Sequence, residues 1–142
     1  MLSRTRLLLL LLSLFSFCWA SGQSAQTTAV PGTIKVTILY PNGDGKNFDM
    51  NYYEQKHMPM VAGFIGKNLK FYEIDKGVSG RTPNDKAPFM AIGYFYISDL
   101  TAYNAAIGQH RDEIVNDFKN YTNIQPVIQI SEVKQLVYPS GK

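Results

Sequence analysis

The sequence predicts a single α+β domain in which strands and helices alternate over about 100 residues. Residues 33–40 alternate between apolar and polar side chains, which is typical of a strand with one buried face. Residues 89–97 form an aromatic and β-branched run, which is typical of a buried strand. Residues 48–57 and 100–107 carry apolar side chains at helical spacing.

The remaining elements follow from turn and capping signals. The predicted strands are 33–40, 69–76, 89–97 and 127–133, and the predicted helices are 48–57, a short turn at 61–65, one beginning after Ser98 or Asp99, and 112–119. Asp49 is a suitable N-cap for the first helix, in which Met50, Tyr53 and His57 share a face. Pro59 disfavours a helical conformation of the residue before it, so we expect this helix to end at His57.

The predicted order is β-α-β-β-α-β, the ferredoxin-like arrangement of an antiparallel sheet with both helices on one face. The second face of such a sheet is uncovered. We expect it to carry apolar residues from several strands, and a patch of that kind is normally buried against a partner. The sequence therefore predicts a homodimer packed sheet to sheet.

The composition is that of a folded domain, because 45% of the 142 residues are hydrophobic and 18% are charged. The net charge is +3. Without Arg4 and Arg6, which lie in a predicted leader, 12 basic residues remain against 11 acidic ones. A nearly neutral domain lacks the basic surface that nucleic acid requires, so we expect no nucleic-acid partner.

Residues 1–25 have the layout of a signal peptide, with two arginines before an apolar run over residues 7–20. The run is shorter than the roughly 20 residues that span a bilayer. Small residues allow cleavage after Ala20 or Ala25. We predict export to the periplasm or the exterior, with no stable membrane insertion after cleavage; an uncleaved anchor is the alternative. A linker at 26–32, the domain at 33–133 and a tail at 134–142 would follow.

No metal or cofactor site is predicted. The single cysteine, Cys18, lies in the leader, so the mature chain has no disulfide, thiolate nucleophile or cysteine metal site. His57 and His110 lack metal-binding spacing, and no glycine-rich nucleotide motif is present. The carboxylates of Asp112, Glu113 and Asp117 are interpreted as a helix surface.

Four segments resemble the EthD family, whose first members were named for a gene cluster for ethyl tert-butyl ether breakdown. Residues 34–41 read IKVTILYP, 48–53 read FDMNYY, 56–59 read KHMP, and 120–133 read NYTNIQPVIQISEV. The resemblance covers about residues 33–133. It implies a dimeric α+β barrel, similar in fold to small monooxygenases, muconolactone isomerases and polyketide cyclases. Members are often labelled reductases, which implies an oxidoreductase.

His57 is the strongest catalytic candidate, because an imidazole can exchange a proton near neutral pH. The alternative is that His57 only caps the last carbonyls of its helix. Tyr40 and Tyr94 are candidates to donate hydrogen bonds to a substrate oxygen. Tyr53 and Tyr96 are candidates for substrate binding, although the strand tyrosines also suit an ordinary sheet core.

Gln129 is a third substrate-binding candidate, because an amide within an apolar strand needs a hydrogen-bond partner. His110 lies near a predicted helix break and is interpreted as part of a solvated face, or as a residue at a pocket mouth. Two functions are compatible with these residues. One is a metal-independent oxidoreductase, of reductase or monooxygenase type, acting on a small organic compound. The other is a non-catalytic dimer that binds a small molecule outside the cytoplasm.

Overall fold

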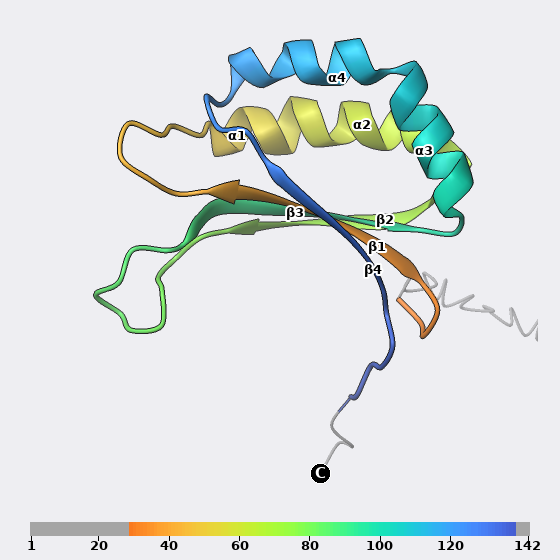
Figure 1. The fold of residues 1–142 in the computed structure, drawn as a ribbon, viewed down its shortest axis with the longest axis horizontal. Helices are drawn as coiled ribbons and strands as arrows, with labels where there is room; N and C mark the ends of the chain where they lie inside the picture. Colours follow the sequence, from red (N-terminus) through yellow and green to blue (C-terminus); the bar gives the residue numbers. More distant parts are fainter. Residues whose placement is uncertain (1–28, 139–142) are drawn as a thin grey trace, which may run out of the picture.

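The computed structural model describes residues 29–138 as a four-stranded antiparallel sheet with helices on one face (Figure 1). The predicted leader, the first three residues of the predicted linker (26–28) and residues 139–142 of the predicted tail lie outside the described residues. The strands are β1 (Ile34–Pro41), β2 (Leu69–Lys76), β3 (Phe89–Ile97) and β4 (Val127–Glu132), and the helices are α1 (Met50–Tyr52), α2 (Met58–Ile65), α3 (Leu100–Gln109) and α4 (Arg111–Asp117). The sheet order is β2-β3-β1-β4, so the predicted ferredoxin-like α+β fold is confirmed. No helix within residues 29–138 is long and apolar enough to cross a membrane.

The strand predictions agree with the structure because side-chain alternation fixes which residues are buried. In β1, Val36, Ile38 and Tyr40 are buried and their neighbours are half-buried. In β3, Ala91, Phe95 and Ile97 are buried in the same alternating way. These residues face the helices and form the core with them.

The first helix does not end at His57, contrary to the sequence prediction. Tyr53–His57 is a π-helical turn, called η1, that joins α1 to α2 without a break. The Met58 N–H bonds to the Tyr53 carbonyl five residues earlier. This wider turn ends two residues before Pro59, where a regular α-helix would clash with the proline ring.

The π turn also keeps one face of the helix on the core. The buried residues Tyr53, His57, Val61 and Ile65 lie four apart. In an α-helix each such step rotates the side chain by about 40° away from the previous one. A turn with more residues reduces this drift, so His57 stays above the sheet.

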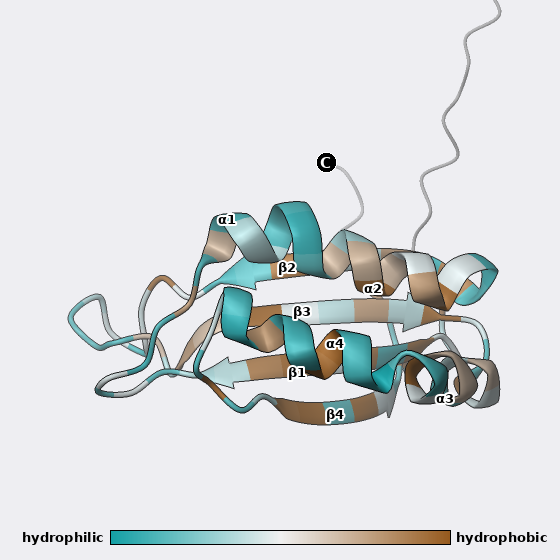
Figure 2. Ribbon diagram, turned by 90° about the horizontal axis from the view of Figure 1, so that it is seen from above, coloured by the Kyte–Doolittle hydropathy of each residue, from teal (hydrophilic) through white to brown (hydrophobic). Residues whose placement is uncertain are grey.

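The second helical region contains a break. Asp99 caps α3 by accepting the Ala102 N–H at 2.6 Å. His110 separates α3 from α4 and stacks on Phe64, with ring centroids 3.9 Å apart. A short 3-10 turn, η3 (Phe118–Asn120), follows α4. Figure 2 shows that these helices leave β4 at an edge of the sheet that no helix covers.

The uncovered face of the sheet carries apolar residues from three strands, as predicted, together with a row of polar residues. Its rows are fixed by strand register: Gln129, Thr37, Tyr94 and Glu73 form one row, and Val127, Leu39, Ile92 and Asp75 form the next. The first row is therefore polar, and the second is apolar except for Asp75 at its end. An apolar centre remains at Leu39 and Ile92.

Candidate functional site

His57 and Asp117 form a hydrogen-bonded pair inside the helical layer. The Nδ1 atom of His57 lies 2.8 Å from Oδ2 of Asp117, and the two side chains are 5% and 13% exposed. The π turn presents His57 and the end of α4 presents Asp117. The sequence separation of 60 residues is closed by packing of the first helix beside α4.

The Asp117 carboxylate is itself held by two further donors. Its Oδ1 accepts the Tyr52 hydroxyl at 2.8 Å and the Asn120 amide at 2.8 Å. Burial raises the pKa of Asp117, but the hydrogen bonds from His57, Asn120 and Tyr52 outweigh it and hold this pKa below its ordinary value. Asp117 is therefore ionised at neutral pH and can only accept hydrogen bonds.

An ionised partner fixes the protonation of the His57 ring. Burial lowers the pKa of His57 below 6.5, although the hydrogen bond and charge of Asp117 oppose the shift. At neutral pH the imidazole is uncharged, and its single proton lies on Nδ1 because Asp117 accepts there. Nε2 then carries a free lone pair.

A cavity of about 80 Å³, lined in part by His57, lies between the helices and the sheet. Its lining residues are Ile38, Tyr40, Tyr53, His57, Met58, Val61, Phe95, Tyr103, Ile107, Ile114, Phe118, Pro126 and Ile128. Within residues 29–138 no fully buried side-chain nitrogen or oxygen lacks a partner. No protein group among the described residues bonds to Nε2, so this atom must retain some solvent-accessible area. The cavity is a space that His57 lines.

Buried tyrosines surround the pair. The hydroxyls of Tyr40 and Tyr121 lie 2.9 Å apart, and Tyr53 stacks on His57 with ring centroids 5.6 Å apart. Burial raises the pKa of Tyr40, Tyr53 and Tyr121 far above the ordinary value, so all three stay protonated. Neutral phenols can donate hydrogen bonds to an oxygen that gains negative charge.

Tyr53 approaches the sheet closely because of Gly93 in β3. A Cβ atom at Gly93 would overlap the Tyr53 hydroxyl. Gly93 is therefore a position at which the strand must lack a side chain for the aromatic ring to reach its place.

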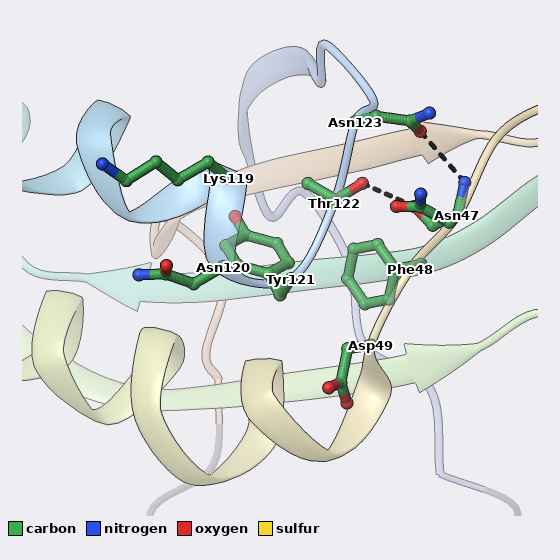
Figure 3. A pocket seen from close by; sticks show the side chains of 8 residues that line it. All are labelled: Asn47, Phe48, Asp49, Lys119, Asn120, Tyr121, Thr122 and Asn123. Atoms are coloured by element: carbon green, nitrogen blue, oxygen red, sulfur yellow. Dashed lines mark hydrogen bonds between the residues drawn. The ribbon is translucent and has the colours of Figure 1, made fainter.

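A second, larger hollow of about 390 Å³ lies where the chain enters α1 and leaves η3 (Figure 3). Several of its polar groups are already used within the chain. Thr122 donates its hydroxyl to the Asn47 carbonyl at 2.8 Å, and Asn123 accepts the Asn47 N–H at 3.0 Å. The Asp49 N–H bonds to the Tyr121 carbonyl at 2.7 Å. These hydrogen bonds join the two segments and hold Tyr121 next to Tyr40.

The predicted site residues separate into two groups. His57, Tyr40 and Tyr53 all line the small cavity. Tyr94, Tyr96 and Gln129 lie on the uncovered face of the sheet and do not reach it. There Tyr96 donates to Glu73 at 2.8 Å, and the Lys35 ammonium lies 5.4 Å from the Tyr94 ring centroid. Burial and the neighbouring Asp75 raise the pKa of Tyr94 to about 12.

The sequence analysis missed Asp117, which it assigned to a helix surface. It also missed Tyr52, Asn120 and Tyr121 as parts of the site. The signal available was the spacing of Asp117, Asn120 and Tyr121 at i, i+3 and i+4, which places them on one side of a helical turn. The predicted cap role of His57 is not what the structure shows, because its Nδ1 bonds to a side chain of another helix.

The other histidine is not part of the cavity. The Nδ1 atom of His110 lies 2.9 Å from Glu113 at the surface, at the helix break near which the sequence placed it. Within the described part of the chain, no cluster of three or more His, Cys, Asp or Glu side chains is arranged to hold a metal ion.

Known proteins resemble this chain in fold and, in one case, also in sequence. No protein-family model matches the chain, and no curated protein matches it. An EthD-like protein of Ralstonia eutropha is 39% identical, with a TM-score of 0.69 over 72% of this chain and 93% of that chain. An ethyl tert-butyl ether D (EthD) family protein of Bacillus halodurans is 16% identical, with a TM-score of 0.54 over 71% and 98% of the two chains. A protein of Arabidopsis thaliana is 14% identical, with a TM-score of 0.52 over 74% and 99%.

The second and third of these similarities concern the fold alone. The first, at 39% identity across almost the whole of the other chain, concerns the sequence as well. It agrees with the family resemblance of the segments around Tyr40, His57 and Tyr121. The chain belongs to the EthD-like family.

Proposed function

We propose that this protein is an enzyme that moves a proton on a small, largely apolar organic molecule bound between the helices and the sheet. His57 is the acid–base group and Asp117 is its positioning residue. The observation that carries the proposal is that the two nitrogens of the His57 ring have different hydrogen-bonding roles. Nδ1 is committed to an ionised carboxylate at 2.8 Å, and Nε2 is left with a lone pair beside an apolar cavity.

The surroundings suit a proton transfer. When Nε2 takes a proton, the ring becomes an imidazolium, and the adjacent Asp117 carboxylate stabilises that charge. The substrate becomes an anion, and Tyr40, which lines the cavity, can donate to its oxygen when Tyr121 supplies the proton between the two hydroxyls. The returning proton comes from Nε2, so the ring ends in its starting state.

The oxidoreductase class rests on the family resemblance. Proton transfer to or from the substrate is a step that reductase-, monooxygenase- and isomerase-type reactions of small carbonyl and aromatic compounds share. The apolar walls favour a substrate of low polarity in each case. A non-catalytic binding protein would use the same cavity but would not need a committed His57–Asp117 pair.

The test is a comparison of His57→Gln with His110→Gln, the matched histidine outside the cavity. Native mass spectrometry of the purified protein identifies a retained small molecule. That molecule is then incubated with protein in D₂O, and deuterium uptake measures proton transfer. We expect His57→Gln to slow uptake by on the order of 10²–10⁴ while the ligand still binds, and His110→Gln to leave it unchanged. Equal uptake by both variants would favour the binding protein.

We also propose that the protein acts outside the cytoplasm after removal of its leader. The support is the arginine-containing start and the apolar run over residues 7–20. The intact mass of the native protein checks this, since cleavage after Ala20 or Ala25 removes a defined mass. An intact Met1 on protein from the cytoplasmic fraction would contradict it.

A further inference from the structure

His57 offers the cavity a hydrogen-bond acceptor and no donor. Asp117 accepts three donors, from His57, Tyr52 and Asn120, and so cannot also receive a proton from the ring without losing that arrangement. The proton of His57 stays on Nδ1. Nε2 therefore offers an acceptor to whatever enters, and an acceptor is satisfied only by a ligand that carries a donor.

The walls are equally selective for charge. The lining residues, all of them in the described part of the chain, include no Lys, Arg, Asp or Glu. A charged ligand would lose its hydration there and find no opposite charge, which costs far more than a neutral ligand of the same size. The occupant is therefore uncharged.

The volume of the cavity limits the size of the ligand. Its volume of about 80 Å³ is smaller than the ~150 Å³ that accepts a benzene molecule in a closed cavity. This cavity has an open side. Among its lining residues, Ile128 on the edge strand β4 is 59% exposed, and Ile107 and Ile114 are half-buried. A six-membered ring, which needs more than 80 Å³, would extend from the cavity toward the exposed Ile128.

We infer that the ligand of this cavity is an uncharged, ring-sized apolar molecule that presents a single hydroxyl, a phenol or an enol, to Nε2 of His57. This rests on the proposed function and names its substrate class. It distinguishes the hydroxyl form of such a compound from its carbonyl form, because a carbonyl oxygen has no proton to donate to Nε2.

Phenol and toluene are matched probes, because they differ only in a hydroxyl against a methyl group. Each is titrated into the purified protein at pH 7.5, and the side-chain ¹⁵N signal of His57 and the Kd are measured by NMR. We expect phenol to bind on the order of tenfold more tightly than toluene and to move the Nε2 signal. Toluene binding as tightly as phenol, or neither binding at millimolar concentration, would overturn the inference.

His57→Phe removes the acceptor and should reverse the preference, so that toluene binds more tightly than phenol. Circular dichroism shows whether the variant folds. If it does not, lowering the pH of the unmodified protein tests the same point, because the added proton on Nε2 makes it a donor. Asp117 is the charged group that faces the ring, and Tyr53 and Tyr121 beside it stay neutral throughout.

In that acidic sample the affinity for phenol should fall, and the affinity for benzaldehyde, a carbonyl acceptor of similar size, should rise. An unchanged order would contradict the inference. The outcomes for the two proposals are separate. A preference for phenol together with deuterium uptake that is indifferent to His57→Gln would end the proposed enzyme and leave the binding specificity. Slowed deuterium uptake in His57→Gln with no preference for phenol would overturn the binding specificity and leave the proposed enzyme.

Discussion

His57 donates its Nδ1–H to Asp117 across 2.8 Å and thereby links the π-helical turn to the end of α4. Each residue fixes the protonation state of the other. The carboxylate keeps the ring proton on Nδ1, and the ring is one of three donors that keep the carboxylate ionised at 13% exposure. Removing either partner leaves a polar group without its hydrogen bond inside the helical layer.

Asp117→Asn should impair the site without removing His57. The carboxylate raises the pKa of His57 against burial, so we expect that pKa to fall further when the charge is lost. The ring proton is no longer committed to Nδ1, and turnover should drop by on the order of 10²-fold or more. The free energy of unfolding should fall by about 1–3 kcal/mol, measured in urea. Asp112→Asn, an exposed change on the same helix, is the control and should leave both unchanged.

Stability should depend on pH in two separate windows. His57 has a folded pKa below its unfolded value of 6.5, so the unfolded chain binds the proton more readily. The free energy of unfolding should therefore decrease as the pH falls from about 6.5 toward the folded pKa of His57. Asp117, whose folded pKa is also lowered, adds stability above its unfolded pKa that is lost at more acidic pH. Urea titrations between pH 4 and 8 measure the first window, and His57→Gln should remove it.

Gly93→Ala should destabilise the fold and displace Tyr53, because the new Cβ would overlap the Tyr53 hydroxyl. Overpacking of this kind costs about 1–3 kcal/mol. Gly63→Ala is the matched control, since no atom lies within 4 Å of its Cβ position and it lies inside α2. There alanine should be neutral or stabilising by about 0.5–1 kcal/mol. Equal losses in both variants would remove the role assigned to Gly93.

The uncovered sheet face should bind a second copy of the chain. Leu39 and Ile92 form its apolar centre, and the neighbouring row of Gln129, Thr37, Tyr94 and Glu73 carries polar groups that can pair across an interface. Sedimentation at micromolar concentration should show a dimer. Leu39→Lys should shift it toward monomer, whereas Val115→Lys, at a site that is 47% exposed on α4, should not. A clean monomer of the unmodified protein would refute the interface.

Local patterns were sufficient to predict the sheet, and they failed where contacts are distant in sequence. β2 and β3 have the predicted bounds because turn residues enclose runs of strand-forming ones. Pro59 suggested an end to the first helix, but a π turn ends two residues before it and the helix continues. Asp117 looked like surface because its three partners include residues 60 and 65 positions away.

The faces of β3 show a second reason. Every residue of this strand except Gly93 is apolar or aromatic, so alternation separates two faces without telling which one meets the helices. Tyr94 and Tyr96 were assigned to the same pocket as His57 on that basis. The helices cover the other face, on which Phe95 is buried and Gly93 leaves room for Tyr53.

The protonation of His57 tests the account most directly. A ¹⁵N spectrum of the histidine side chains, recorded at pH 7.5 and assigned with His57→Gln, reports the state of each ring nitrogen. The account predicts a neutral His57 ring with the proton on Nδ1 and a free lone pair on Nε2, and it predicts that this state persists below pH 6.5. A proton on Nε2 at pH 7.5, in either the neutral or the charged ring, would contradict it.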